Sequence, residues 1–97
     1  MKEADVCTVF RALASPSRLR IVRILLRRSY CVHALTSRLS ISQPAVSQHL
    51  AVLKDAGLVT DDRAGTKVHY AVNRERLAAA HRAFADLCRE AGRKETV

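Results

Sequence analysis

Apolar residues recur at helical spacing through the first quarter of the chain. Over residues 3–14 they fall three and four positions apart, which places Val6, Val9, Phe10 and Leu13 on one helix face. Ser15 and Pro16 interrupt the pattern and restart it, because proline is tolerated in the first turn of a helix. The apolar side of the next helix is formed by Leu19, Val22, Leu25 and Leu26. The pattern predicts two successive amphipathic helices.

A second pair of helices is predicted between residues 32 and 56. Residues 32–39 fit a short helix with one apolar face, made of Val32, Leu35 and Leu39. Residues 40–42 break this pattern, and residues 43–56 resume it with a packed stripe of Val46, Leu50 and Leu53. Gly57 stands where a left-handed C-terminal cap is needed. A helix, a turn of three or four residues and another helix form a helix-turn-helix.

The period of the pattern changes after Gly57. Residues 58–60 and 68–72 are β-prone, and the charged segment between them contains Gly65, so they predict a hairpin. Helical spacing returns from Glu75 in a short heptad seam formed by Leu77, Ala80, Phe84, Leu87 and Ala91. The predicted fold is mainly α with a two-stranded β-hairpin, in the order α-α-α-α-β-β-α. We expect one domain over residues 1–97.

Charge points to a nucleic-acid partner. The chain has 17 Lys and Arg against 9 Asp and Glu, a formal net charge of +8, so a polyanion is the first partner to consider. Single-stranded nucleic acid is held on aromatic stacking platforms, and only 4% of this chain is aromatic. The composition therefore favours duplex DNA over single strands. The alternative is that the positive charge serves only solubility, as in many small proteins.

The chain shows no membrane or secretion signal. No apolar run approaches the roughly 20 residues of a bilayer span. The residues that follow Met1 lack the basic-then-apolar order of a signal peptide. We expect a cytoplasmic protein, in which Cys7, Cys31 and Cys88 are thiols and do not form a disulfide framework.

Polar side chains on the helix at residues 43–56 are the candidate readers of DNA. Gln43, Ser47 and Gln48 face away from its packed stripe. Glutamine can pair with both hydrogen-bonding positions of adenine in the major groove, and early positions of a recognition helix reach base edges. The alternative is an ordinary solvated helix face. At the hairpin, Arg63 and Lys67 flank Gly65 and could contact the DNA backbone or minor groove.

Several blocks of the sequence resemble the ArsR/SmtB family of winged helix-turn-helix repressors. They are residues 13–22, 42–50 and 53–59, followed by a wing-like segment with Arg63, Gly65, Val68, Tyr70 and Val72. The resemblance implies a homodimer that represses its own operon and releases DNA when a metal, metalloid or other small signal binds. We expect the operator of such a dimer to be an inverted repeat. The resemblance also implies dimerisation through the first and last helices, which agrees with the seam from Leu77 to Ala91. That seam could alternatively pack within one protomer.

His49 matches the family position that closes its Ser-x-His-Leu-like motif. The resemblance gives it a phosphate contact or a supporting role in that helix. A histidine on a helix is also commonly a satisfied structural residue. We therefore count His49 with Gln43, Ser47, Gln48, Arg63 and Lys67 as a candidate DNA-contacting residue.

Cys31 and His33 resemble the family's Cys-Val-Cys metal motif, with histidine replacing the second cysteine and Ala34 replacing the acidic residue. A thiolate and an imidazole suit Zn(II), Cd(II), Cu(I) or a similar soft to borderline ion. Positions two apart do not face each other on a regular helix, so the helix start would have to be non-helical. The family implies Cys7 as the third ligand, from the other subunit.

Two alternatives to metal sensing stay open. Cys31 could be a small buried apolar residue, and Cys88 could pack at the dimer seam. The cysteines could instead sense oxidants or persulfides as thiols. An enzyme is not expected, since the sequence has no paired catalytic carboxylates, no glycine-rich phosphate loop and no nucleophile with an evident base. A winged helix that docks a partner protein is the remaining alternative to a repressor.

Overall fold

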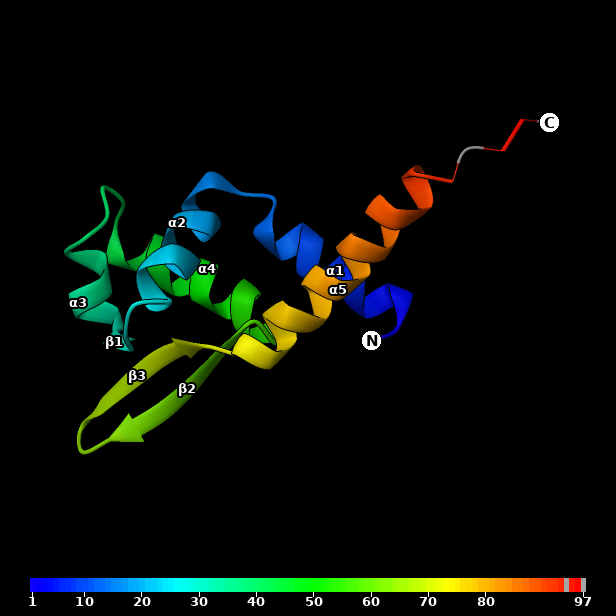
Figure 1. Ribbon diagram of the computed structural model, residues 1–97. Coiled ribbons are helices and arrows are strands. Elements are labelled where there is room, and N and C mark those ends of the chain that lie inside the picture. Colours follow the sequence, from blue (N-terminus) through cyan, green and yellow to red (C-terminus); the bar gives the residue numbers. More distant parts are fainter. Residues whose placement is uncertain (94, 97) are drawn as a thin grey trace.

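Helices surround one core, and a β-hairpin extends from it (Figure 1). The computed structural model describes residues 1–93, 95 and 96. Its elements run in the order α1 (Glu3–Leu13), α2 (Pro16–Leu25), β1 (Tyr30–Cys31), α3 (Val32–Thr36), α4 (Gln43–Asp55), β2 (Val59–Ala64), β3 (Lys67–Val72) and α5 (Arg74–Ala91). The mainly helical winged fold and the order of its helices and hairpin are confirmed. None of the described helices combines the length and apolar composition that a bilayer span requires.

Serine side chains cap the starts of α2 and α4, at the two breaks that the sequence predicted. The hydroxyl of Ser15 accepts a hydrogen bond from the Arg18 N–H at the start of α2, and Ser42 accepts one from Ala45 at the start of α4. Such side chains satisfy backbone donors that have no partner inside the helix. Gly57 ends α4 with φ 77°, and the Leu58 N–H donates to the Leu53 carbonyl across the cap. This is a Schellman ending, which needs the left-handed conformation.

The sheet has one strand more than predicted. Tyr30 and Cys31 form β1, which pairs antiparallel with β3 in the order β1-β3-β2. Two residues are too few to show an alternating pattern in the sequence. The strand is recognised only by its pairing with β3, which lies far away in the chain. The hairpin is also longer than predicted, because β2 and β3 leave only Gly65 and Thr66 at the turn. In addition, α3 ends at Thr36 and not at Leu39.

The core lies where α2, α3, α4 and the base of the hairpin meet, and α1 and α5 add to its edge. The predicted α4 stripe is confirmed, since Val46, Leu50 and Leu53 are at most 2% exposed. On α2 the prediction was wrong for Leu19, which is 42% exposed. Ile21 is buried in its place, together with Val22 and Leu25. The sequence shows which residues are apolar, whereas the neighbouring helices decide which side of α2 they cover.

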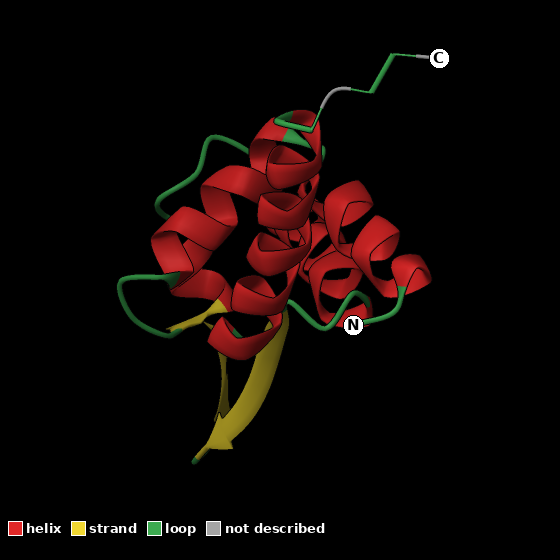
Figure 2. Ribbon diagram, turned by 45° about the vertical axis from the view of Figure 1, so that its right-hand side comes forward, coloured by secondary structure: helices red, strands yellow, loops and turns green. Residues whose placement is uncertain are grey.

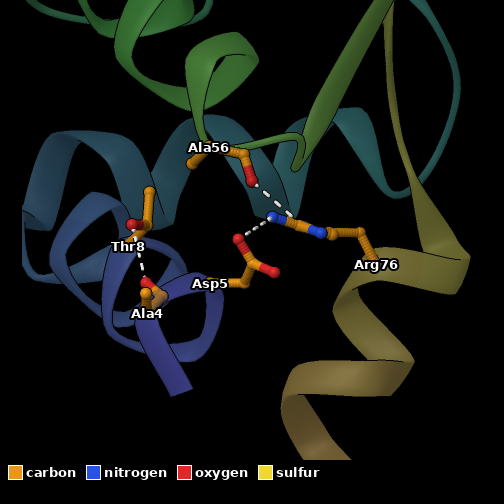
Figure 3. Close-up of polar contacts among 5 residues, drawn as sticks. All are labelled: Ala4, Asp5, Thr8, Ala56 and Arg76. Carbon is orange, nitrogen blue, oxygen red and sulfur yellow. Dashed lines mark hydrogen bonds and ion pairs between the residues drawn. The ribbon is translucent and has the colours of Figure 1, made fainter. Parts of the chain in front are cut away.

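Arg76 of α5 contacts both α1 and the end of α4 (Figure 3). The Arg76 Nε of α5 donates to the Ala56 carbonyl at the end of α4, at 3.2 Å. The same guanidinium lies 3.7 Å from an Asp5 carboxylate oxygen of α1. The Asn73 side chain caps the first turn of α5 by accepting a hydrogen bond from the Arg76 N–H. α5 also packs against α1. Figure 2 shows the strands extending away from the packed helices.

Gly57→Ala is expected to destabilise the fold more than Gly65→Ala. Both glycines have positive φ, so each alanine carries a left-handed backbone cost of about 1–2 kcal/mol. A Cβ at Gly57 would also lie 3.1 Å from the Arg76 Nε, whereas a Cβ at Gly65 meets nothing within 4 Å. Urea denaturation of the two variants measures the difference. An equal loss of unfolding free energy in the two variants would mean that the Arg76 side chain moves aside without an energetic cost.

Candidate nucleic-acid interface

The polar residues predicted to read DNA lie on the solvent side of α4. Gln43, Ser47 and Gln48 are exposed, whereas the stripe on the other side of the same helix is buried. Ser42 and Pro44 fix the first turn, so Gln43 is the first residue of the helix. The exposed positions lie in the N-terminal half of α4, where a recognition helix reaches base edges.

His49 is half-buried and contacts α2. Its Nδ1 lies 3.3 Å from the Arg18 Nη1, and the Arg18 Nε donates to the Ala12 carbonyl at 2.6 Å. A guanidinium can only donate, so Nδ1 is the acceptor and the proton of a neutral imidazole sits on Nε2. Arg18 therefore links α1, α2 and α4 and leaves His49 Nε2 as a hydrogen-bond donor.

The hairpin carries the two predicted wing cations beside its turn. Arg63 and Lys67 are both exposed. In the register Arg63 pairs with Val68, and Ala64 pairs with Lys67. Since side chains alternate between the faces of a hairpin, Arg63 and Lys67 emerge on opposite faces. The two cations thus flank the wing and do not form one patch.

An ion pair holds the wing against the end of α4. The Lys54 Nζ donates to an Asp61 carboxylate oxygen at 2.7 Å. This hydrogen bond, with the Coulomb attraction between the two charges, raises the pKa of Lys54. The same hydrogen bond is the main cause that lowers the pKa of Asp61. Both groups stay charged across the neutral range, so the ion pair persists at neutral pH.

The candidate metal ligands are not assembled within one protomer. Across the part of the chain that the structure describes, no three His, Cys, Asp or Glu side chains are grouped to hold a metal ion. Cys7 is exposed on α1, a helix that packs on α2, α4 and α5. His33 is exposed on α3. A set of Cys7, Cys31 and His33 would therefore need a second subunit.

Cys31 has the non-helical position that its predicted role requires. It is the N-cap of α3, with an extended backbone, and its Sγ accepts from the Ala34 N–H at 3.5 Å. In the sheet it is the register partner of His69 on β3, so these two side chains leave the same face. Sequence reasoning did not consider His69, because the pairing of β1 with β3 joins residues far apart in the chain.

The seam on α5 is divided between the protomer core and solvent. Ala80 is 3% exposed, and Leu77 packs against the core. Further along, Phe84 is 54% and Leu87 is 56% exposed, and Ala91 is exposed as well. Phe84 meets Phe10 of α1 edge-to-face, with ring centroids 6.3 Å apart. Together α1 and α5 therefore present an open apolar surface.

Comparison with known proteins places the chain in a family. Residues 15–61, which span α2 to the first half of β2, match the bacterial regulatory proteins of the arsR family. The solved structure of reduced HlyU from Vibrio cholerae is 37% identical, with a TM-score of 0.70 over 80% of this chain and 83% of that one. The chain belongs to the ArsR family. Its relatives are regulatory proteins and not enzymes.

Two curated ArsR-family relatives extend the match. The HTH-type transcriptional repressor SmtB of Mycobacterium tuberculosis is 47% identical over 70 residues, which cover 72% of this chain and 52% of that protein. A probable mercury resistance operon repressor of Streptomyces lividans is 42% identical over 69 residues, covering 71% and 55%. The chain thus spans about half the length of these curated relatives.

Proposed function

We propose that this chain is a homodimeric, sequence-specific DNA-binding repressor of transcription. The observation that carries the proposal is the exposed polar half of α4, held by a buried stripe on its other side and placed beside a wing that carries Arg63 and Lys67. Membership of the ArsR family and likeness to the M. tuberculosis SmtB repressor support the same activity.

In the proposed complex, one α4 from each subunit enters the major groove of an inverted repeat, with half-sites about 34 Å apart. Gln43, Ser47 and Gln48 read base edges, and Arg63 and Lys67 contact the backbone or minor groove on either side of the wing. His49 donates from Nε2 to a phosphate, because Arg18 occupies its Nδ1. These cationic and phosphate contacts give a steep dependence of affinity on salt.

Gln48→Ala tests the reading role. A bidentate pair to a base contributes about 1–3 kcal/mol of discrimination, so we expect operator affinity to fall by about 10- to 100-fold. The protein's own promoter region is the duplex, and a gel shift at fixed salt is the measurement. Glu90→Ala, an equally exposed change on α5, should leave the affinity unchanged. Unchanged affinity for Gln48→Ala, with the dimer intact, would contradict the role.

The dimer surface in this proposal is the apolar side of α1 and α5. Phe10, Leu13, Leu77, Ala80, His81 and Phe84 line a groove of about 360 Å³ there. A second copy is the occupant we propose, since exposed apolar patches of this kind mark protein interfaces. Ala80 shapes the floor of the groove, and Phe84, Leu87 and Ala91 supply the exposed contacts.

We further propose that a soft or borderline metal or metalloid ion bound near Cys31 and His33 releases the operator. The extended backbone of Cys31 frees its thiol from helical geometry. A relative with 42% identity is a probable mercury resistance repressor, which supports an ion of this kind. Cys7 of the second subunit is the proposed third ligand. Such coupling between effector and DNA is typically 1–3 kcal/mol.

Cys31→Ser is expected to keep operator binding and to lose release by the metal. Removal of the thiolate takes away the softest ligand, whereas α3 can still be capped by the serine hydroxyl. Release from the promoter duplex is measured with Zn(II), Cd(II), Hg(II) and arsenite, and with a thiol oxidant as a separate arm. Cys88→Ser is the matched control. Persisting metal release in Cys31→Ser would place the site elsewhere, and release by the oxidant alone would favour thiol sensing.

A further inference from the structure

A groove with four arginines lies on the side of α2 that faces solvent. It has a volume of about 720 Å³, which is in the size range of small-molecule sites. Its lining comes from α2, the turn after it, β1 and the segment after α3. It consists of Pro16, Leu19, Arg20, Arg23, Ile24, Arg27, Tyr30 and Arg38. None of the residues proposed above to contact DNA, a metal ion or a second subunit is among them.

The groove is positive and has no acidic counter-charge. No Asp or Glu occurs anywhere between Asp5 and Asp55, so every element that lines the groove is free of carboxylates. The ion pairs among the described residues join Lys54 to Asp61, Arg76 to Asp5 and Arg89 to Asp86, and none of them involves a lining arginine. An anion would meet four guanidinium groups there, each of which can bind a carboxylate or phosphate in bidentate fashion.

The floor of the groove is apolar. Leu19 is 42% exposed, and Ile24 and Tyr30 are half-buried. The Arg38 guanidinium carbon lies 5.4 Å from the centroid of the Tyr30 ring, a cation–π contact that holds this arginine over the floor. A ligand that fits both features carries an anionic group and an apolar or aromatic body.

The groove points away from the proposed DNA surface. Ile21, Val22 and Leu25 form the buried side of α2, and Arg18, near that side, contacts His49 of α4. Arg20 and Arg23 lie on the opposite side of α2, and Arg27 follows in the turn after the helix. In Figure 1, α2 lies in front of the more distant α4. Arg20 and Arg23 therefore lie on the side of α2 that is turned away from its packing contact with α4.

We propose that this groove binds a small organic anion, such as an aromatic or aliphatic carboxylate or phosphate. Its position also offers a route to the DNA-binding elements, and this part rests on the proposed function. Arg38 precedes α4, and Tyr30 is the register partner of Tyr70 in the wing strand β3. A ligand that draws Arg38 away from Tyr30 acts on the approach to α4 and on the wing together.

The binding test uses the full chain, labelled with ¹⁵N, and 4-phenylbutyrate as the probe. Amide signals of α2, Tyr30 and Arg38 should shift on titration, whereas 4-phenylbutanol, which lacks the charge, should bind at least tenfold more weakly. Arg20→Gln/Arg23→Gln/Arg27→Gln should weaken phenylbutyrate at least tenfold. Arg82→Gln/Arg89→Gln/Arg93→Gln removes the same charge from the α5 end of the chain and should have no effect. Inorganic phosphate measures the contribution of charge alone and should bind more weakly than phenylbutyrate.

Three results would overturn the proposal. Equal binding of the alcohol and the carboxylate would mean that the arginines do not select an anion. Shifts confined to the apolar surface of α1 and α5 would place the ligand elsewhere. If the triple variant binds phenylbutyrate as tightly as the wild-type chain but loses duplex affinity, the groove is part of the nucleic-acid surface. A single Arg38→Gln variant repeats the comparison with a smaller change to the fold.

The effector role has its own readout. Phenylbutyrate should change the affinity of the wild-type chain for its promoter duplex and leave that of the triple glutamine variant unchanged. Binding in the groove without any change in duplex affinity would refute the coupling. If the wild-type chain binds no duplex at all, the proposed repressor function fails, and the ¹⁵N titration still decides the binding site.

Discussion

Phe84→Glu/Leu87→Glu is expected to turn the protein into a monomer and to lower its affinity for the inverted-repeat operator by two to four orders of magnitude. Both side chains are more than half exposed, so a protomer can carry the charges without disturbing its own core. In a dimer the same charges would be buried against apolar surface without partners, which is strongly unfavourable. Linked half-site binding exceeds single-site affinity by about 10²–10⁴, and the monomer loses that gain.

Sedimentation equilibrium and gel shifts with whole and half operators measure the two effects. Ala78→Glu/Ala85→Glu adds the same charge on another side of α5 and should leave the dimer and its affinity intact. Binding of the glutamate variant to a single half-site should change little. A variant that stays dimeric would place the interface away from the exposed end of the seam, and a monomer with full operator affinity would show that pairing does not contribute to DNA binding.

Leu53→Ala is expected to lower the free energy of unfolding by about 2–5 kcal/mol, the usual range for a buried leucine replaced by alanine. The Leu53 side chain is 0% exposed, and its carbonyl closes the Schellman ending of α4 by accepting from Leu58. The substitution leaves a cavity beneath α4. Because domains of this size are stable by only about 5–15 kcal/mol, that loss is a large share of the total.

Val52→Ala is the matched control, since Val52 is the preceding residue and is 40% exposed. Changes at exposed positions are usually within about 0.5 kcal/mol. Urea denaturation of both variants, at one protein concentration because a dimer couples stability to concentration, gives the comparison. Similar losses at the two positions would contradict the assignment of α4's buried side.

Local patterns predicted most of the helical framework. The starts of α2 and α4 follow from Ser15 and Ser42, each of which satisfies a backbone donor three residues ahead. The end of α4 follows from Gly57, which can adopt positive φ without a side-chain clash. These signals lie within a few residues of the boundary they set, so the sequence is sufficient to find them.

The candidate DNA surface was predictable for the same reason. A helix with a buried stripe of Val46 and Leu50 must expose the other side, and Gln43 and Ser47 are on it. What the sequence could not give was the partner of His49. Arg18 is 31 positions away, and only the packing of α2 on α4 brings their nitrogens to 3.3 Å.

By itself, then, the sequence determined the helices, their caps, the hairpin and the polar face of α4, because periodicity and capping act over a few residues. Tertiary structure alone decided the pairing of β1 with β3, the burial of Ile21 in place of Leu19, and the tie from Arg76 to Ala56. It also divided the α5 seam, since α1 and the core cover Ala80 and leave Phe84 exposed. Each of these depends on which distant surface a residue meets, and that is settled only when the helices pack.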